Sequence, residues 1–348
     1  MSNLIAAMPR ARTPDPLSAP SLRWGVVGTG WIADRFVTAL RKHSSQRIRA
    51  VGSRTKESAT RFAQRFGIER AHGRYEELLS DPGIDVVYIA TPHNAHLPQA
   101  LLALEAGKHV VVEKPFALNA TQGQRIADEA QSRGLFCMEA YWTAFLPKFD
   151  VLRQLLDVGA LGEVTAVVAD FGEWFDPDHR IHRRELAGGP MLELGTYLIS
   201  LVHDVVGSPD EIVATSTATS TGVTGQTAML LSRRDQRAVL HTTILTNTPT
   251  SATIAGTAAT IHIDGPFYQP GGFTLAPTIG TGSLRYDEPL IAHEGLHYQA
   301  AEVARRITAG DTQSSLRPLS TSISVLKVMD EVRRQTGDHY PDERNDNQ

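Results

Sequence analysis

From Trp24 to about Met138, short apolar runs alternate with segments of helical period. In one such segment Ile32, Phe36 and Leu40 recur at the spacing of a single helix face. Strand candidates rich in Val and Ile lie at residues 24–27, 47–51, 85–90, 109–112 and 135–138. Strands of this kind, each followed by a helix, favour right-handed crossovers and a parallel sheet covered on both faces. The pattern therefore predicts a doubly wound α/β domain over residues 21–140.

The pattern changes after residue 140. Helical periods are expected at about residues 147–158, 190–206, 298–309 and 320–335. Runs containing Thr, Val and Ile follow one another at residues 164–171, 211–218, 226–232, 238–245 and 260–263. Consecutive strands with short connections are typical of antiparallel sheets. We therefore expect residues 141–348 to form an α+β domain built on a mostly antiparallel open sheet.

The composition is that of a globular protein with two domains. The chain has 348 residues, of which 41% are hydrophobic and 21% charged, and one hydrophobic core rarely serves such a length. The net charge is -4 with both signs mixed, so no basic tract favours nucleic acid or a membrane surface as a partner. The single cysteine, Cys137, permits no disulfide within the chain, and its apolar run indicates a core residue rather than a nucleophile.

The first 20 residues are expected to be a disordered arm rich in Pro and Ala. Their apolar stretch at residues 4–8 is shorter than a secretory core, and its basic residues follow it. No segment has the apolar length of a membrane span. These features predict a cytoplasmic protein. The alternative for the arm is that it packs on a neighbouring subunit.

A glycine-rich turn follows the first strand candidate. It reads Gly28-Thr29-Gly30-Trp31-Ile32-Ala33, a G-x-G-x-x-A pattern that opens a predicted helix. The glycines let backbone N–H groups approach a pyrophosphate at the positive end of the helix, and the small Ala33 lets helix and strand pack closely. In this strand–turn–helix context the pattern predicts a dinucleotide site. A βα turn without a ligand is the alternative.

The end of the second strand candidate bears on which dinucleotide binds. An NAD-selective site usually has Asp or Glu there, which accepts a hydrogen bond from the ribose 2′-hydroxyl. This chain has Gly52-Ser53-Arg54-Thr55-Lys56, with no carboxylate before Glu57. Ser53 and Arg54 suit a 2′-phosphate, which favours NADP(H) over NAD(H). The alternative is that Arg54 is a solvated loop charge.

Two further stretches carry candidate chemistry. Lys114 follows the fourth strand candidate, at the edge where ligands of open parallel sheets bind. Glu193 and Tyr197 are four residues apart, on one face of a helix that begins at Pro190 after two glycines. A surface lysine and an ordinary amphipathic helix are the alternatives at these two places.

Taken together, these motifs resemble a known family. The G-x-G-x-x-A turn, Glu113-Lys114-Pro115 and the run Gly-Gly-x-x-x-Glu-x-Gly-x-Tyr at residues 188–197 are similar to the glucose–fructose oxidoreductase, inositol dehydrogenase and MocA (Gfo/Idh/MocA) family. The runs at residues 91–96, 106–110 and 138–142 match as well. The resemblance spans about residues 22–341 and is greatest to the dimeric dihydrodiol dehydrogenase branch. It implies a Rossmann domain followed by an α+β domain that binds substrate and forms a homodimer or tetramer.

The resemblance also implies a reaction, in which a hydride moves between the nicotinamide and an alcohol, ketone or hemiacetal of a sugar, polyol or dihydrodiol. It makes Lys114 and Tyr197 the catalytic pair with Glu193 in support, and it puts Trp142 and Phe171 in the substrate pocket. An alcohol that loses a hydride must also lose a proton, and a nearby ammonium lowers the pKa of a tyrosine from its usual value of about 10. The cofactor contacts that it implies are Gly28, Thr29, Gly30, Trp31, Ile32, Ser53, Arg54, Thr91, Pro92, Asn94, His96, Glu113 and Lys114.

The chain departs from the family pattern at two places. Ala144 stands two residues after Trp142, where this branch often has Arg, and Glu193 stands where relatives commonly have Asp. Both departures bear on the identity of the substrate more than on the type of reaction.

Two other functions are considered. A non-catalytic NADP-binding sensor or regulator would need the nucleotide site but neither Lys114 nor Tyr197. His293-Glu294-Gly295-Leu296-His297 matches the H-E-x-x-H pattern of zinc hydrolases. Such a site needs both histidines on one stable helix and a third ligand, and Gly295 weakens the helix, so no metal is expected.

Overall fold

The structure, a computed structural model, describes residues 7–341 and residue 343. The chain divides into two compact units, each built from separate stretches of sequence. The parallel-sheet unit comprises Pro14–Phe145 and Ala292–Ile323. The mixed-sheet unit comprises Leu146–Ile291, the described residues before Pro14 and those from Ser324 on. Residues 292–323, which we assigned from the sequence to the second domain, belong to the parallel-sheet unit.

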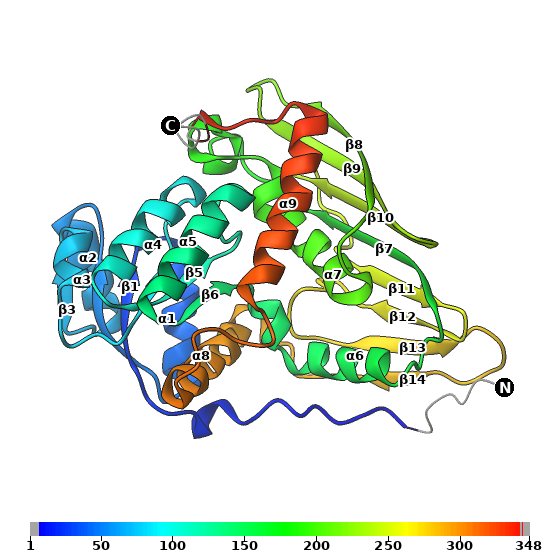
Figure 1. Cartoon of the computed structure of the whole chain (residues 1–348), viewed down its shortest axis with the longest axis horizontal. Coiled ribbons are helices and arrows are strands. Elements are labelled where there is room, and N and C mark those ends of the chain that lie inside the picture. Colours follow the sequence, from blue (N-terminus) through cyan, green and yellow to red (C-terminus); the bar gives the residue numbers. More distant parts are fainter. Residues whose placement is uncertain (1–6, 342, 344–348) are drawn as a thin grey trace. The chain divides into compact units, whose positions relative to one another are not determined.

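A parallel sheet of six strands in the order β3-β2-β1-β4-β5-β6 is the centre of the parallel-sheet unit as the structure describes it. The strands are β1 (Arg23–Val27), β2 (Arg47–Gly52), β3 (Arg70–His72), β4 (Val86–Ile89), β5 (His109–Glu113) and β6 (Cys137–Ala140). The helices are α1 (Trp31–His43), α2 (Lys56–Phe66), α3 (Tyr75–Leu79), α4 (His96–Glu105), α5 (Ala120–Arg133) and α8 (His297–Ala309) (Figure 1). The strand order reverses between β1 and β4, which confirms the predicted doubly wound fold.

Local sequence explains most of these elements. Gly67 ends α2 in the left-handed conformation with φ 56°, as its place after an apolar helical stripe predicts. Cys137 is fully buried in β6, which confirms that it is a core residue, and burial raises its pKa to about 12. The prediction missed β3, because its three residues are half-buried and show no alternation. Pairing with β2, not the pattern of β3 itself, makes this segment a strand.

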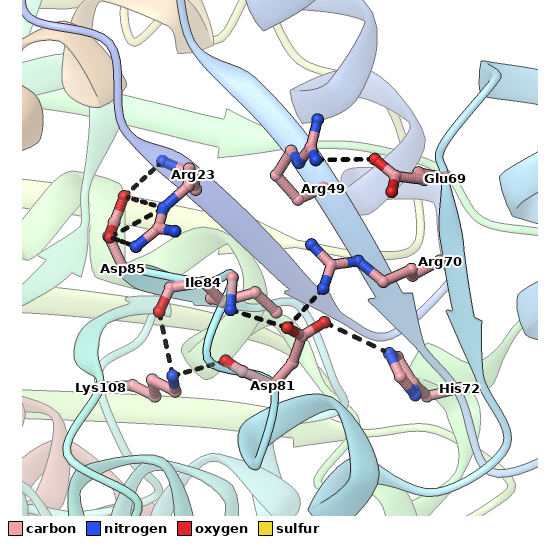
Figure 2. A network of polar contacts seen from close by, with 10 residues as sticks. Arg23, Arg49, Glu69, Arg70, His72, Asp81, Ile84, Asp85 and Lys108 are labelled. Carbon is pink, nitrogen blue, oxygen red and sulfur yellow. Dashed lines mark hydrogen bonds and ion pairs between the residues drawn. The ribbon is translucent and has the colours of Figure 1, made fainter.

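A polar network holds the strands together at the amino edge of this sheet (Figure 2). The carboxylate of Asp81 accepts hydrogen bonds from Arg70 Nη1 (2.5 Å) and from the backbone N–H of Gly83 (2.8 Å). Lys108 Nζ donates to the backbone carbonyls of Asp81 (2.7 Å) and Ile84 (3.0 Å). Arg70 begins β3 and Lys108 directly precedes β5, so the network joins strands at one edge and leaves the carboxyl edge to other residues.

The mixed-sheet unit has a sheet of eight described strands in the order β14-β13-β12-β11-β7-β10-β9-β8. Its strands are β7 (Val164–Gly172), β8 (Glu211–Ala218), β9 (Thr224–Arg233), β10 (Gln236–Thr243), β11 (Ala252–Gly256), β12 (Ala259–Ile263), β13 (Phe273–Pro277) and β14 (Leu284–Tyr286). Only the β7–β10 pair is parallel among them, which confirms the mostly antiparallel prediction. The sequence did not predict β11, β13 and β14, which are five residues long or shorter.

The helices of this unit are α6 (Pro147–Asp157), α7 (Thr196–Val206) and, from Ser324 on, α9 (Leu319–Thr336). Helix α7 packs on β7 and β10 (Figure 1). Within residues 7–341 and 343, every helix is too short or too polar to span a bilayer.

The amino-terminal arm has a defined path from residue 7, contrary to the expectation of disorder; residues 1–6, with most of the apolar stretch, lie outside the described residues. In the mixed-sheet unit, the Asp150 carboxylate accepts hydrogen bonds from the backbone N–H (2.6 Å) and Nη2 (3.0 Å) of Arg12. In the parallel-sheet unit, Ala19 is buried against Ala301 and Ala304 of α8. These long-range contacts hold a segment that has few hydrogen bonds of its own, and composition could not show them.

Candidate active site

The glycine-rich turn connects β1 to α1 at the carboxyl edge of the parallel sheet. Gly28 has φ 108°, and a Cβ atom there would lie 2.5 Å from the carbonyl oxygen of Ala90, so only glycine fits. Gly30 precedes α1 with no side-chain cap, and a Cβ atom there would meet nothing within 4 Å. Open space before the positive end of a helix suits a phosphate group. The turn, which includes Thr29, Trp31 and Ile32, therefore fits the pyrophosphate of a dinucleotide.

Ser53 and Arg54 follow β2 at the same edge. Ser53 is buried, and its Oγ lies 3.4 Å from Oγ1 of Thr29 in the glycine-rich turn. Arg54 is exposed, and no described carboxylate forms an ion pair with it. Burial raises the pKa of Tyr75, and the charge of Arg54 offsets part of that rise, so the two side chains are neighbours. An exposed guanidinium beside a buried hydroxyl is a suitable environment for a phosphate.

The strand end that carries Lys114 is held by buried acceptors. The carboxylate of Glu113 accepts hydrogen bonds from the hydroxyl of Tyr88 and from the backbone N–H of Lys114 (3.1 Å). The imidazole of His96 lies with Nδ1 2.9 Å from the carbonyl oxygen of Pro115 and Nε2 3.1 Å from that of Thr91. His96 therefore joins the loop after β4, which includes Pro92 and Asn94, to the loop after β5. Both loops lie at the carboxyl edge, beside the glycine-rich turn.

The segment after Lys114 is braced by a fully buried ion pair. The carboxylate of Glu139, in β6, accepts hydrogen bonds from the backbone N–H of Phe116 (3.0 Å) and from Ser322 Oγ (2.6 Å). It also accepts from Arg317 Nε (2.9 Å) and Nη2 (2.7 Å), and both side chains are 1% exposed or less. Arg317 and Ser322 come from the returning segment of residues 292–323. This segment therefore helps to fix the backbone on which Lys114 lies.

The mixed-sheet unit contains a cluster of aromatic rings. The ring of Tyr197 lies 5.8 Å from that of Phe171 and 4.5 Å from that of Tyr268, centroid to centroid. Phe171 and Tyr268 are stacked at 4.8 Å, and burial raises the pKa of Tyr268 to about 12. Tyr268 was not singled out from the sequence, because it lies in a turn between strands with no periodic pattern. The sequence does contain one indication of Tyr268. It begins a Tyr-Gln-Pro-Gly-Gly turn at residues 268–272, which follows a predicted strand.

The helix that carries Tyr197 begins with a π-helical turn, η6 (Met191–Gly195), and not with the regular α-helix expected from Pro190. A Cβ atom at Gly195 would lie 2.8 Å from the sulfur of Met191, so the Met191 side chain packs directly on this glycine. Single π-helical turns are often found at functional sites. Glu193, in this turn, is bound by Arg180, whose Nη2 lies 2.8 Å from its Oε2.

The predicted site residues fall into two groups, one in each unit. Lys114, Trp142 and the predicted nucleotide contacts belong to the parallel-sheet unit, and Trp142 is buried in η3 (Trp142–Phe145), directly after β6. Tyr197, Glu193 and Phe171 belong to the mixed-sheet unit.

The H-E-x-x-H pattern does not form a metal site in the described residues. Ala292–Leu296 is a 3-10 helix, η7, and α8 begins at His297, so the two histidines are not on one α-helix. Glu294 binds Lys42 (2.8 Å) and His43 (2.6 Å). No group of three or more His, Cys, Asp or Glu residues suited to a metal ion occurs in residues 7–341 and 343.

The fold and the glycine-rich turn define a protein with a dinucleotide-binding Rossmann domain, and sequence comparison specifies its family. The family model described as an oxidoreductase family with an NAD-binding Rossmann fold matches residues 22–141, and the C-terminal domain of the same family matches residues 149–262. The chain belongs to the Gfo/Idh/MocA family, as its motifs predicted, and it is an NAD(P)-binding enzyme of that family.

Individual relatives agree with this assignment. The chain is 36% identical over 329 residues to a trans-1,2-dihydrobenzene-1,2-diol dehydrogenase of Danio rerio, with 92% of this chain and 98% of the relative covered. It is 32% identical over 338 residues to the enzyme of that name from Homo sapiens, with 93% and 99% covered. Among solved structures, the 3-ketoreductase KijD10 from Actinomadura kijaniata with NADP and TDP-benzene has a TM-score of 0.82 at 25% identity, with 91% and 98% covered. A levoglucosan dehydrogenase with NADH and levoglucosan shares the fold, with a TM-score of 0.83 at 18% identity and the same coverage.

The buried ion pair of Glu139 and Arg317 is expected to stabilise the folded protein. Arg317→Met leaves a buried carboxylate without its cation, which we expect to lower the free energy of unfolding by about 3–5 kcal/mol. The double variant Glu139→Gln/Arg317→Met removes the stranded charge and should recover part of the loss. The measurement is urea unfolding, with the exposed Arg61→Met as control. Equal urea midpoints of unfolding for Arg317→Met and Arg61→Met would show that the ion pair does not stabilise the protein.

Proposed function

We propose that this protein is an NADP-dependent dehydrogenase or reductase that acts on an alcohol or carbonyl group of a sugar, polyol or dihydrodiol. The observation that carries the proposal is the convergence of the glycine-rich turn, Arg54 and Lys114 on one edge of the parallel sheet. Ligands of doubly wound folds bind at that edge. The relatives named dihydrodiol dehydrogenase, and the NADP-bound ketoreductase, support the substrate class. The cytoplasmic location stays a prediction.

The proposed reaction consists of a hydride transfer and a proton transfer. The bound nicotinamide supplies or accepts the hydride. In the direction of reduction, the hydroxyl of Tyr197 gives a proton to the substrate oxygen, and in oxidation the phenolate takes that proton back. The ammonium of Lys114 holds the substrate oxygen and stabilises the phenolate. The resemblance assigns Trp142 and Phe171 to the substrate pocket, where their apolar rings would exclude water from the reacting carbon.

The ion pair of Glu193 and Arg180 lies near the start of the helix that carries Tyr197. This ion pair is half-buried. Glu193 lies in η6, about one turn before Tyr197, which lies in α7. We assign Glu193 a supporting role, in which it fixes the start of the Tyr197 helix and offers a carboxylate to substrate hydroxyl groups. Within the mixed-sheet unit, Arg180 is the cation that pairs with Glu193.

The catalytic pair is tested by two substitutions. We expect Tyr197→Phe and Lys114→Met each to lower kcat by about 10²–10⁴-fold, because each removes a participant in proton transfer. Tyr197→Phe should leave the Kd for NADPH within about twofold, since the phenol belongs to the proton step. Turnover is measured on a panel of diols, aldoses and keto sugars, with Tyr286→Phe in β14 as control. Full turnover in both variants would refute this role. Nucleotide binding by the unmodified protein without turnover of any panel member would favour a non-catalytic NADP-binding sensor.

The preference for NADP rests on Arg54 and Ser53 at the end of β2. We expect Arg54→Gln to raise the Kd for NADPH by about tenfold or more, because a charge-assisted contact to the 2′-phosphate is lost. The Kd for NADH should not change. Fluorescence titration measures both, and Arg61→Gln, an exposed arginine of α2, is the matched control. Tighter binding of NADH than of NADPH by the unmodified protein would show that the preference is the reverse.

We also propose that the protein is a homodimer or tetramer formed through the mixed sheet. Val168, Val239, Leu230 and Val213 face one another across β7, β10, β9 and β8 in consecutive register. Each is 40–55% exposed, so together they form an apolar row on the open face of the sheet. A contiguous exposed apolar row of this kind marks an interaction site, and a second copy of the same row is its natural complement.

Val239→Asp tests this assembly. A carboxylate in the middle of the row would be desolvated in the interface, so we expect the protein to become a monomer. Sedimentation velocity measures the mass. The matched control is Val158→Asp, which places the same charge at an exposed valine outside the sheet. An unchanged mass in Val239→Asp, or a monomeric parent protein, would contradict the proposal.

A further inference from the structure

An imidazole lies between two indole rings in the parallel-sheet unit. The ring of His293 in η7 lies 4.7 Å from that of Trp31, nearly perpendicular to it at 81°. It lies 5.5 Å from the ring of Trp142, stacked at 28°. Trp31 belongs to the glycine-rich turn and Trp142 follows β6, so His293 stands between the nucleotide end and the predicted substrate end of one unit.

The backbone that carries His293 is fixed to α1. The neighbouring Glu294 binds Lys42 and His43 at the carboxyl end of that helix, at 2.8 Å and 2.6 Å. The imidazole of His297 lies with Nδ1 2.5 Å from the carbonyl oxygen of Glu294. The H-E-x-x-H segment is therefore a clamp along α1, with His293 placed at the end of the helix where the pyrophosphate is expected.

Within residues 7–341 and 343, neither ring nitrogen of His293, which is half-buried, has a hydrogen-bond partner. Burial, followed by the charges of Arg35 and Lys114, lowers its pKa to about 4. Near neutral pH the ring is therefore uncharged, with one N–H donor and one acceptor nitrogen. The two indoles contact the ring and leave both nitrogens able to bond a ligand.

We propose that His293 is a binding residue for the nicotinamide half of the cofactor, donating a hydrogen bond to an oxygen of its ribose or adjoining phosphate. This inference rests on the proposed function. A dinucleotide that starts at the glycine-rich turn and ends at Lys114 must pass the space between them. The imidazole contacts Trp31, which follows Gly30 of the glycine-rich turn, and lies within range of the charge of Lys114. Trp31 and Trp142 hold the ring in the orientation that presents its nitrogen to the ligand.

The test compares the affinity for the whole cofactor with the affinity for its adenosine half alone. His293→Phe keeps a ring between the indoles and removes both nitrogens. We expect the Kd for NADPH to rise by about tenfold, the value of one well-formed hydrogen bond. The Kd for 2′,5′-ADP, which has no nicotinamide half, should stay within about twofold. His293→Gln, which keeps a donor and an acceptor, should bind NADPH more tightly than His293→Phe. Isothermal titration measures all three constants without turnover.

Several outcomes would overturn this inference. Unchanged NADPH affinity in His293→Phe would show that the nitrogens do not contact the cofactor. Equal losses for NADPH and 2′,5′-ADP would show that His293 only supports α1. A parent protein that binds NADH but not NADPH would refute only the proposed cofactor preference. The affinities of His293→Phe and the parent protein are then compared for NADH and ADP. A parent that binds neither nucleotide would overturn the proposed function and this inference together.

Discussion

The position of the site depends on one buried carboxylate. Glu139 receives hydrogen bonds from the backbone beside Lys114, from Arg317 and from Ser322, and none of its partners is adjacent to it in sequence. A charge so completely removed from water persists only where every oxygen is paired. The carboxylate therefore fixes three separate stretches of chain at once. The loop after β5 can hold an ammonium at the carboxyl edge of the sheet because it is tied there.

The returning segment of residues 292–323 completes the nucleotide-binding unit in two ways. Through Arg317 and Ser322 it braces the loop of Lys114, and through Glu294 and His293 it clamps α1. Polar side chains thus secure both edges of the parallel sheet. The network around Asp81 joins strands at the amino edge and has no part in the proposed chemistry (Figure 2). The carboxyl edge keeps open space before α1, which is the arrangement that a dinucleotide requires.

The sequence predicted what depends on local patterns and missed what depends on distant contacts. The parallel sheet, the glycine-rich turn and the cap at Gly67 follow from periodicity and backbone geometry, and the family follows from ordered motifs. The strand β3 and the ordered arm were missed, because pairing with β2 and binding to Asp150 create them. His293 was considered only as a zinc ligand, since the H-E-x-x-H spacing hides its real neighbours, Trp31 and Trp142. The roles of Lys114 and Tyr197 remain predictions from resemblance.

We propose that a nicotinamide dinucleotide binds at the carboxyl edge of the parallel sheet, from the glycine-rich turn to the loop of Lys114. Hydrogen–deuterium exchange with and without NADPH tests it most directly. We predict slower exchange in peptides that cover residues 28–36, 91–96 and 113–117, and in the clamp at residues 292–297. Peptides of the amino edge around Asp81 should not change. Protection at the amino edge, or no protection at the glycine-rich turn when NADPH is saturating, would contradict the account.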